Sequence, residues 1–212
     1  RRVSLDLAGT IPAVAETRAF LADTSPDKRR KLVDQLLARG SYVRHFTNVW
    51  HSLVLPETAT NQQLSYVAVE FDAWLRKQLA ENVPYDQMVR DILTVPLLPR
   101  GSGAYAYYSR SPTATPTAFF AAKESEPGNL AAATARVFLG IRVECAQCHD
   151  HPFAPWKQDQ FWEFAAFYDG IKQQPRSPFS AIKDLFGLGK KREMEIAIPG
   201  TDRFVAAHFV DG

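Results

Sequence analysis

The only two cysteines of the chain lie in one five-residue stretch, Cys145-Ala146-Gln147-Cys148-His149. This Cys-x-x-Cys-His spacing is the one used for c-type haem attachment. The two thiols add to the two vinyl groups of the macrocycle, and the adjacent histidine is held under the ring as the proximal iron ligand. The sequence therefore predicts one covalent haem c, attached through Cys145 and Cys148, with His149 as the metal ligand.

Two other uses of the cysteines remain open. Cys145, Cys148, His149 and His151 supply two sulfurs and two nitrogens, which is a donor set for zinc. Adjacent ligands such as Cys148 and His149 are awkward for one tetrahedral ion, and no second ligand pair follows at finger-like distance. A disulfide or a dithiol redox pair is the other alternative, but that setting usually follows a strand in a βαβ unit, which this sequence does not indicate.

The sequence does not indicate the iron ligand opposite His149. The candidates for this distal position are His45, His51, His208, Met88 and Met194, and the position can also be vacant. A methionine raises the reduction potential, a second histidine lowers it, and a vacant position permits small-molecule binding or catalysis. His151 follows His149 too closely to reach the opposite face of the same ring. It either hydrogen-bonds a haem propionate or caps the turn before Pro152.

Composition indicates an ordinary globular chain. Hydrophobic residues make up 46% and charged residues 23% of the 212 positions, which is the profile of a soluble protein and not of a disordered one. A net charge of +2 is too small to indicate binding to nucleic acid or to an anionic membrane. No stretch approaches the roughly 20 apolar residues of a membrane-spanning helix. Both ends of the sequence read as cuts in a longer polypeptide, so the missing signal peptide is uninformative.

Hydrophobic periodicity predicts a mainly α fold. Helices are expected at 13–22, from Ser25-Pro26 to Gly40, and at 42–55, 64–80, 87–94, 130–139 and 158–168. Ser25 and Asn129 are expected to cap the N-termini of their helices, and Gly40 and Gly140 are expected to end theirs. Alternation around 199–202 predicts a small C-terminal β-hairpin within 194–209. The fold class is therefore a multi-helix domain with a β-hairpin appendage.

The connection 95–127 is expected to be long, with one short helix at 116–123. Tyr105, Tyr107 and Tyr108 lie in its middle, and loops of this length are usually functional or mobile. The loop motivates the alternative of a haem enzyme with an open sixth iron site. The basic run Lys190-Lys191-Arg192 is expected to be a solvated face, or a patch that steers an acidic redox partner.

Four stretches of the sequence carry a family resemblance. They are Arg2-Val3-Ser4-Leu5-Asp6-Leu7-Ala8-Gly9-Thr10-Ile11-Pro12, Asn82-Val83-Pro84-Tyr85-Asp86-Gln87, Phe138-Leu139-Gly140-Ile141-Arg142 and Cys145-Ala146-Gln147-Cys148-His149-Asp150-His151-Pro152-Phe153. In this order they resemble the planctomycete-type cytochrome-like domain of the second kind, a family catalogued as a domain of unknown function. The resemblance implies that residues 1–212 are one cytochrome-c-like haem domain of a secreted or periplasmic multidomain protein. It carries over Cys145, Cys148 and His149 as haem residues, and no distal ligand.

The expected function is electron transfer by a mono-haem c-type cytochrome domain outside the cytoplasm. Its partner is expected to be a redox protein or a neighbouring domain of the same polypeptide, with no nucleic acid and no membrane span in this segment. Whether the chain is also an enzyme is left open, with a carrier favoured over a catalyst. The alternatives are a haem enzyme with an open sixth site and a non-haem binding module stabilised by zinc or a disulfide.

Overall fold

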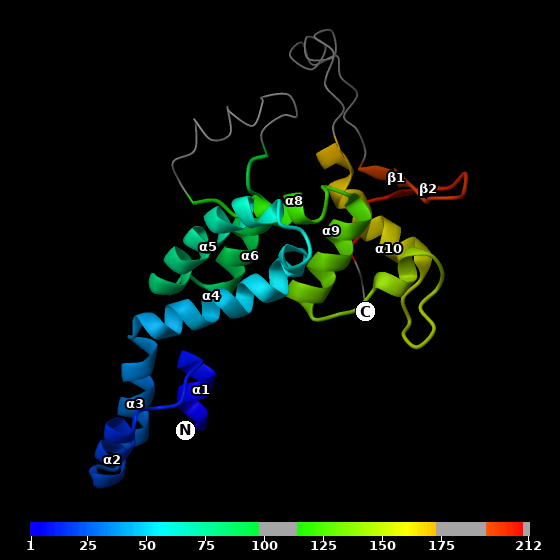
Figure 1. The fold of residues 1–212 in the computed structure, drawn as a ribbon. Helices are drawn as coiled ribbons and strands as arrows, with labels where there is room; N and C mark the ends of the chain where they lie inside the picture. The colour runs from blue at the N-terminus through cyan, green and yellow to red at the C-terminus, as the bar shows by residue number, and fades with distance from the viewer. Residues whose placement is uncertain (98–113, 173–193, 210–212) are drawn as a thin grey trace. The chain divides into compact units, whose positions relative to one another are not determined.

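The computed structural model describes residues 1–97, 114–172 and 194–209 (Figure 1). The chain divides into two compact units. The first unit comprises Arg1–Leu93 with Ala114–Pro116, and the second comprises the segments that begin at Thr94 and at Thr117. Both units are built mainly of helices, and the second also contains a two-stranded antiparallel hairpin. The predicted fold class, mainly α with a small C-terminal β-hairpin, is confirmed.

The first unit is a set of helices joined by short turns. Its elements are α1 (Arg2–Ala8), α2 (Val14–Ala22), α3 (Lys28–Leu37), α4 (Gly40–Val54), the 3₁₀ turn η1 (Pro56–Ala59), α5 (Leu64–Ala80) and α6 (Tyr85–Leu93). Helix α4 packs against α5, α1 and α3. Phe71 and Leu75 on α5 and Ile92 on α6 are almost completely buried, so the apolar faces predicted for these two helices form the core of this unit.

Helix α1 was not among the predicted helices, and Gly9 explains how it ends. Gly9 adopts the left-handed conformation (φ 69°), and its N–H bonds to the carbonyl of Leu5. A Cβ atom at this position would lie 2.4 Å from Nδ1 of His45 on α4. Only glycine satisfies both the backbone conformation and this close approach of α1 to α4.

The second unit is organised around α10. Its elements are α8 (Ala118–Ala122), α9 (Pro127–Thr134), the π-helical turn η2 (Ala135–Leu139), the 3₁₀ turn η3 (Glu144–Gln147), α10 (Gln158–Ala165), η4 (Ala166–Lys172), β1 (Glu195–Ala197) and β2 (Phe204–Ala206). Helix α10 contacts α9, η3, η4 and both strands. It contributes Phe161, Trp162 and Phe164 to the core, and the strands pair with Ile196 opposite Val205.

Three of the four predicted helix caps are wrong. Ser25 donates its hydroxyl to Asp23, and α3 begins at Lys28. Helix α3 ends at Leu37, and Gly40 instead begins α4 after the extended residue Arg39. Asn129 lies inside α9, because Pro127 takes the first helical position, where its missing N–H costs nothing. Gly140 is confirmed as a left-handed cap with φ 71°.

Some predictions fall on residues that the structure does not describe. Tyr105, Tyr107 and Tyr108 and the basic run 190–192 lie outside the described residues. The short helix predicted within 116–123 is confirmed as α8. In the ranges 1–97, 114–172 and 194–209, no helix has both the length and the apolar character needed to cross a bilayer.

Candidate functional site

The two cysteines flank a short 3₁₀ turn in the second unit. Cys145 lies within η3, and Cys148 is the residue at which it ends, with its N–H 3.5 Å from the carbonyl oxygen of Cys145. Residues three apart lie on the same side of a 3₁₀ helix, so the two thiols share a face. Both cysteines are free and exposed, whereas Ala146 between them is fully buried. The turn therefore exposes its two cysteines and packs Ala146 into the interior.

Helix α10 fixes the backbone of this turn through side-chain hydrogen bonds. The indole Nε1–H of Trp162 donates to the carbonyl of Gln147 at 3.0 Å. The side-chain amide of Gln158 donates to the carbonyl of Cys148 at 3.0 Å. Trp162 is almost completely buried, so it is a rigid anchor for the turn. The sequence pattern did not identify either residue as part of the site.

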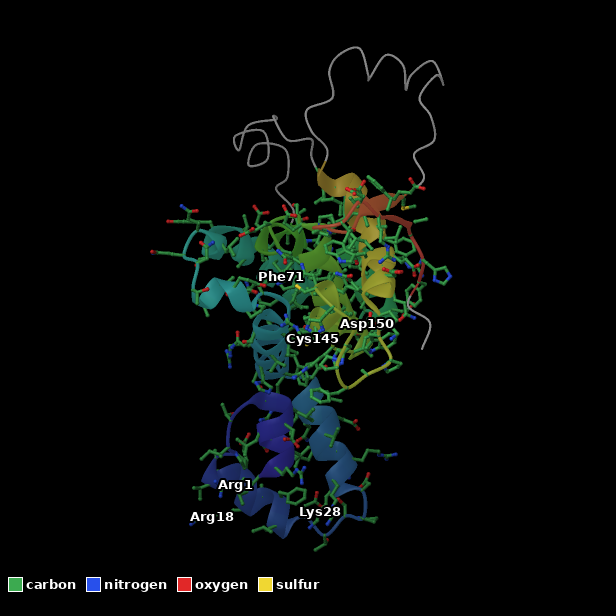
Figure 2. The ribbon with its side chains drawn as sticks, turned by 90° about the vertical axis from the view of Figure 1, so that its right-hand side faces the viewer. Arg1, Arg18, Lys28, Phe71, Cys145 and Asp150 are labelled. Atoms are coloured by element: carbon green, nitrogen blue, oxygen red, sulfur yellow. The ribbon has the colours of Figure 1, made fainter. Side chains whose placement is uncertain are left out.

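Asp150 joins the motif to the start of α10. Its Oδ1 accepts the backbone N–H of Gln158 at 3.0 Å, and its Oδ2 accepts the Lys157 ammonium at 2.9 Å. The Lys157 hydrogen bond, followed by the one from Gln158, lowers the pKa of this carboxyl below its ordinary value. Because Gln158 is the first residue of α10, Asp150 satisfies one of the free N–H groups at that helix end. Figure 2 labels Asp150 together with Cys145, whose sulfur is drawn in yellow.

The two histidines of the motif hold opposite tautomers. Nδ1 of His149 lies 2.7 Å from the carbonyl oxygen of Asp150. A carbonyl only accepts, so Nδ1 carries the hydrogen of the neutral ring, and in that form the lone pair of Nε2 is free to bind a metal. Nδ1 of His151 instead accepts the N–H of Phe153 at 3.1 Å, which places the hydrogen of the neutral ring on Nε2. Of the two, only His149 is prepared as a metal ligand.

His151 caps the turn that follows the motif. Its backbone N–H donates to the carbonyl of Trp156, and its ring accepts from Phe153 two residues on. The structure thus favours the capping role that the sequence left open for this residue. Phe153 itself is 94% exposed, so an uncovered aromatic ring lies close in sequence to the motif.

The donors of this site can be compared with those that a c-type haem and a zinc ion each need. Haem attachment needs two accessible thiols and one imidazole with a free nitrogen, and the turn offers all three. A structural zinc site needs four donors around one ion. Among the described residues, no three His, Cys, Asp or Glu side chains converge in a way that could hold a metal. The space between η3 and α10 is too small to hold a water molecule. It is lined by Val143, Ala146, Trp156, Gln160, Phe161 and Phe164.

The structure separates the candidates for the distal ligand. Met88 is buried in the core of the first unit, and both ring nitrogens of His51 are hydrogen-bonded. His45, also on α4, packs against Gly9. Met194 and His208 lie in the same unit as the motif and are exposed. Nδ1 of His208 lies 2.8 Å from the carbonyl of Phe209, so its Nε2 is free in the same way as that of His149.

A second cluster of polar side chains lies in the first unit, and the spacing of residues in the sequence does not predict it. Nδ1 of His51 lies 2.7 Å from Oδ1 of Asp72, and its Nε2 lies 2.9 Å from the hydroxyl of Thr58. That hydroxyl donates to the carbonyl of Leu55 at 2.8 Å. With its hydrogen so engaged, Thr58 is not set up as a nucleophile. The cluster instead ties α4, α5 and η1 to one another.

Comparison with known proteins identifies a family but no characterised relative. The sequence profile of a family described as PSCyt2, a protein of unknown function (DUF1549), matches residues 1–173. No curated protein and no solved structure matches the chain. The match covers most of the sequence, including the motif and its anchors on α10, and confirms the predicted resemblance. The chain belongs to the PSCyt2 (DUF1549) family.

Proposed function

We propose that this chain is a single-haem c-type cytochrome domain that carries electrons outside the cytoplasm. One observation supports the proposal: the three groups that haem attachment needs lie next to one another in the chain. Cys145 and Cys148 are exposed on one face of η3, and the Nε2 atom of His149 is free. When bound, haem supplies a one-electron carrier whose potential depends on its axial ligands.

The chain's own residues have distinct tasks in this function. Cys145 and Cys148 would hold haem through two thioether bonds, one to each vinyl group, and such an addition of S–H across a double bond would need no oxidant. His149 would be the iron ligand through Nε2, and the carbonyl of Asp150 holds the orientation of its ring. Trp162 and Gln158 hold the turn in place from α10.

The exposure of the motif supports electron transfer to a partner. Both cysteines and His149 are exposed, and Phe153 leaves apolar surface uncovered close to them in sequence. A redox centre near the protein surface can exchange electrons with a second protein or with another domain of the same polypeptide. Thioether attachment takes place outside the cytoplasm, so the proposed location is the periplasm or another extracytoplasmic space.

Spectroelectrochemistry of the holoprotein tests the proposal. The chain is produced in a host with an active haem-attachment system and titrated between its reduced and oxidised forms. We expect a reversible one-electron transition and a ferric spectrum that does not change when cyanide is added. A chain that carries haem but binds cyanide readily would instead support an open-site enzyme, and a chain without haem would refute both.

Two matched variants assign the iron ligand. His149→Gln removes the free Nε2 and is expected to change the ferric spectrum and shift the reduction potential. His151→Gln alters a histidine two residues away whose Nδ1 is already used in the turn. It is expected to leave both readouts unchanged. Equal effects of the two substitutions would contradict the assignment of His149.

A further inference from the structure

The first unit contains a large cavity, and its lining residues are far in sequence from the Cys145–His149 motif. Its volume is about 800 Å³, and it is lined by residues of α1, α2, α3 and the segments that join them. Protein interiors are close-packed, and voids larger than a water molecule are few. A hollow of this size lies instead in the range of small-molecule sites, roughly 300–1,000 Å³. It is therefore a pocket that a ligand can enter.

Apolar side chains line a large part of the pocket. Leu36 on α3 is buried, and Val3, Phe20, Leu32 and Val33 are half-buried around it. Helix α2, which forms another wall, buries none of its residues. The apolar surface at the pocket is thus only partly covered by the protein itself. Binding of a ligand with an apolar body would be favourable, because it would remove this apolar surface from water.

The charged residues of the pocket are mostly basic. Six cationic and two acidic side chains line it, namely Arg1, Arg2, Lys28, Arg29, Lys31 and Arg39 against Glu16 and Asp23. Both acids already have partners. Glu16 accepts hydrogen bonds from Arg39 and from the N–H of Ala13, and Asp23 accepts from Ser25. Because cationic side chains outnumber acidic ones, the two acids offset only part of the positive charge of the lining.

Four of the six cationic side chains have protein partners, and two remain. Arg2 pairs with Asp6, Lys31 with Asp27 and Arg39 with Glu16. The ammonium of Lys28 donates to the carbonyl of Asp23 at 2.8 Å and lies over the ring of Phe20. Within the described part of the chain, Arg1 and Arg29 have no acidic partner. Figure 2 labels Arg1 and Lys28, together with Arg18 on α2, which does not line the pocket.

We propose that the pocket between α1, α2 and α3 binds an organic anion with an apolar ring body, its acidic group facing Arg29 and Arg1. The half-covered apolar wall receives the ring, and the guanidinium groups pair with the carboxylate or sulfonate. This site shares no residue with the Cys145–His149 motif, and the proposal does not rest on haem attachment.

Fluorescence titration of the full chain with 8-anilinonaphthalene-1-sulfonate tests the proposal. N-phenyl-1-naphthylamine, which has the same ring body without the sulfonate, is the matched probe. We expect one molecule of the sulfonate to bind per chain, more tightly than the neutral probe, with an affinity that falls as salt is added. Equal affinity for the two probes, or no saturable binding, would overturn the proposal.

Two pairs of variants place the probe in this pocket. Arg29→Gln is expected to weaken sulfonate binding roughly threefold to fivefold, since it removes one exposed charge, whereas Arg18→Gln leaves the affinity unchanged. Ala19→Phe fills the pocket wall and should reduce binding of both probes. Ala15→Phe, on the same helix but outside the lining, should reduce neither. Equal effects within either pair would show that the probe binds elsewhere and would overturn the proposal.

Discussion

Nδ1 of His149 lies 2.7 Å from the carbonyl oxygen of Asp150, the residue that follows it in the chain. In the neutral ring this contact places the hydrogen on Nδ1 and leaves Nε2 without one. Two residues on, the ring of His151 makes the reverse arrangement with the N–H of Phe153. The backbone partners of the two histidines thus differ, and so does the ring nitrogen that carries the hydrogen.

Nitrogen NMR of the haem-free chain tests this separation. At a pH where both rings are neutral, we expect His149 to carry its hydrogen on Nδ1 and His151 to carry it on Nε2. The long-range nitrogen–proton correlation pattern of each ring reports the tautomer directly. The same tautomer at both positions would contradict the structure.

Asp150 is expected to hold the start of α10 against the motif. Asp150→Ala removes the acceptors for both Lys157 and the backbone N–H of Gln158, so the amide of Gln158 should exchange with solvent several-fold faster. Asp150→Asn keeps one oxygen for Gln158 and should have the smaller effect. An unchanged exchange rate in both variants would show that the carboxylate does not cap this helix.

The His51 cluster is expected to stabilise the first unit. Because the side chains of His51 and Asp72 are each only 26% exposed, His51→Ala leaves a half-buried carboxylate without its partner. The free energy of unfolding should fall by about 1–2 kcal/mol. Ser52→Ala, one residue away and exposed, should change it by less than about 0.5 kcal/mol. Denaturant titration followed by circular dichroism measures both, and equal losses would refute a specific role for the cluster.

Acid is expected to weaken the contact between α2 and the start of α4. Hydrogen bonds from the Ala13 N–H and from Arg39 lower the pKa of Glu16 from its ordinary value of 4.5. A carboxyl whose folded pKa is lowered stabilises the fold above its unfolded pKa, and this contribution is lost as the pH falls through the folded value. Thermal unfolding should therefore show a difference between the wild-type chain and Glu16→Gln at pH 7 that disappears well below pH 4.5. A difference that persists in acid would contradict this account.

The elements that could be predicted are those whose signal is local. Helix α5 has the predicted bounds, Leu64–Ala80, because its apolar face repeats over several turns. Gly140 ends its helix because the left-handed cap favours glycine. Ser25 and Asn129 were misassigned because their side chains found nearer partners, Asp23 and the carbonyl of Lys123. Serine and asparagine favour turns as well as caps, so sequence position alone does not distinguish the two uses.

The candidate haem ligands could be predicted from the sequence, but the residues that hold them in place could not. The spacing of Cys145, Cys148 and His149 is a sequence property, and the 3₁₀ turn explains how it places both thiols on one side. Trp162, Gln158 and the carboxylate of Asp150 act through contacts across 8 to 15 residues. Those contacts exist only once α10 has docked beside η3, so no periodicity in the sequence reports them.

The mass of the intact, denatured chain tests the central claim most directly. Purified from a host that attaches haem to another c-type cytochrome in the same culture, the chain should gain the mass of one haem. A variant with both Cys145→Ala and Cys148→Ala should gain none. An unmodified mass for the wild-type chain, from cells in which the control cytochrome is loaded, would contradict covalent haem attachment at this motif.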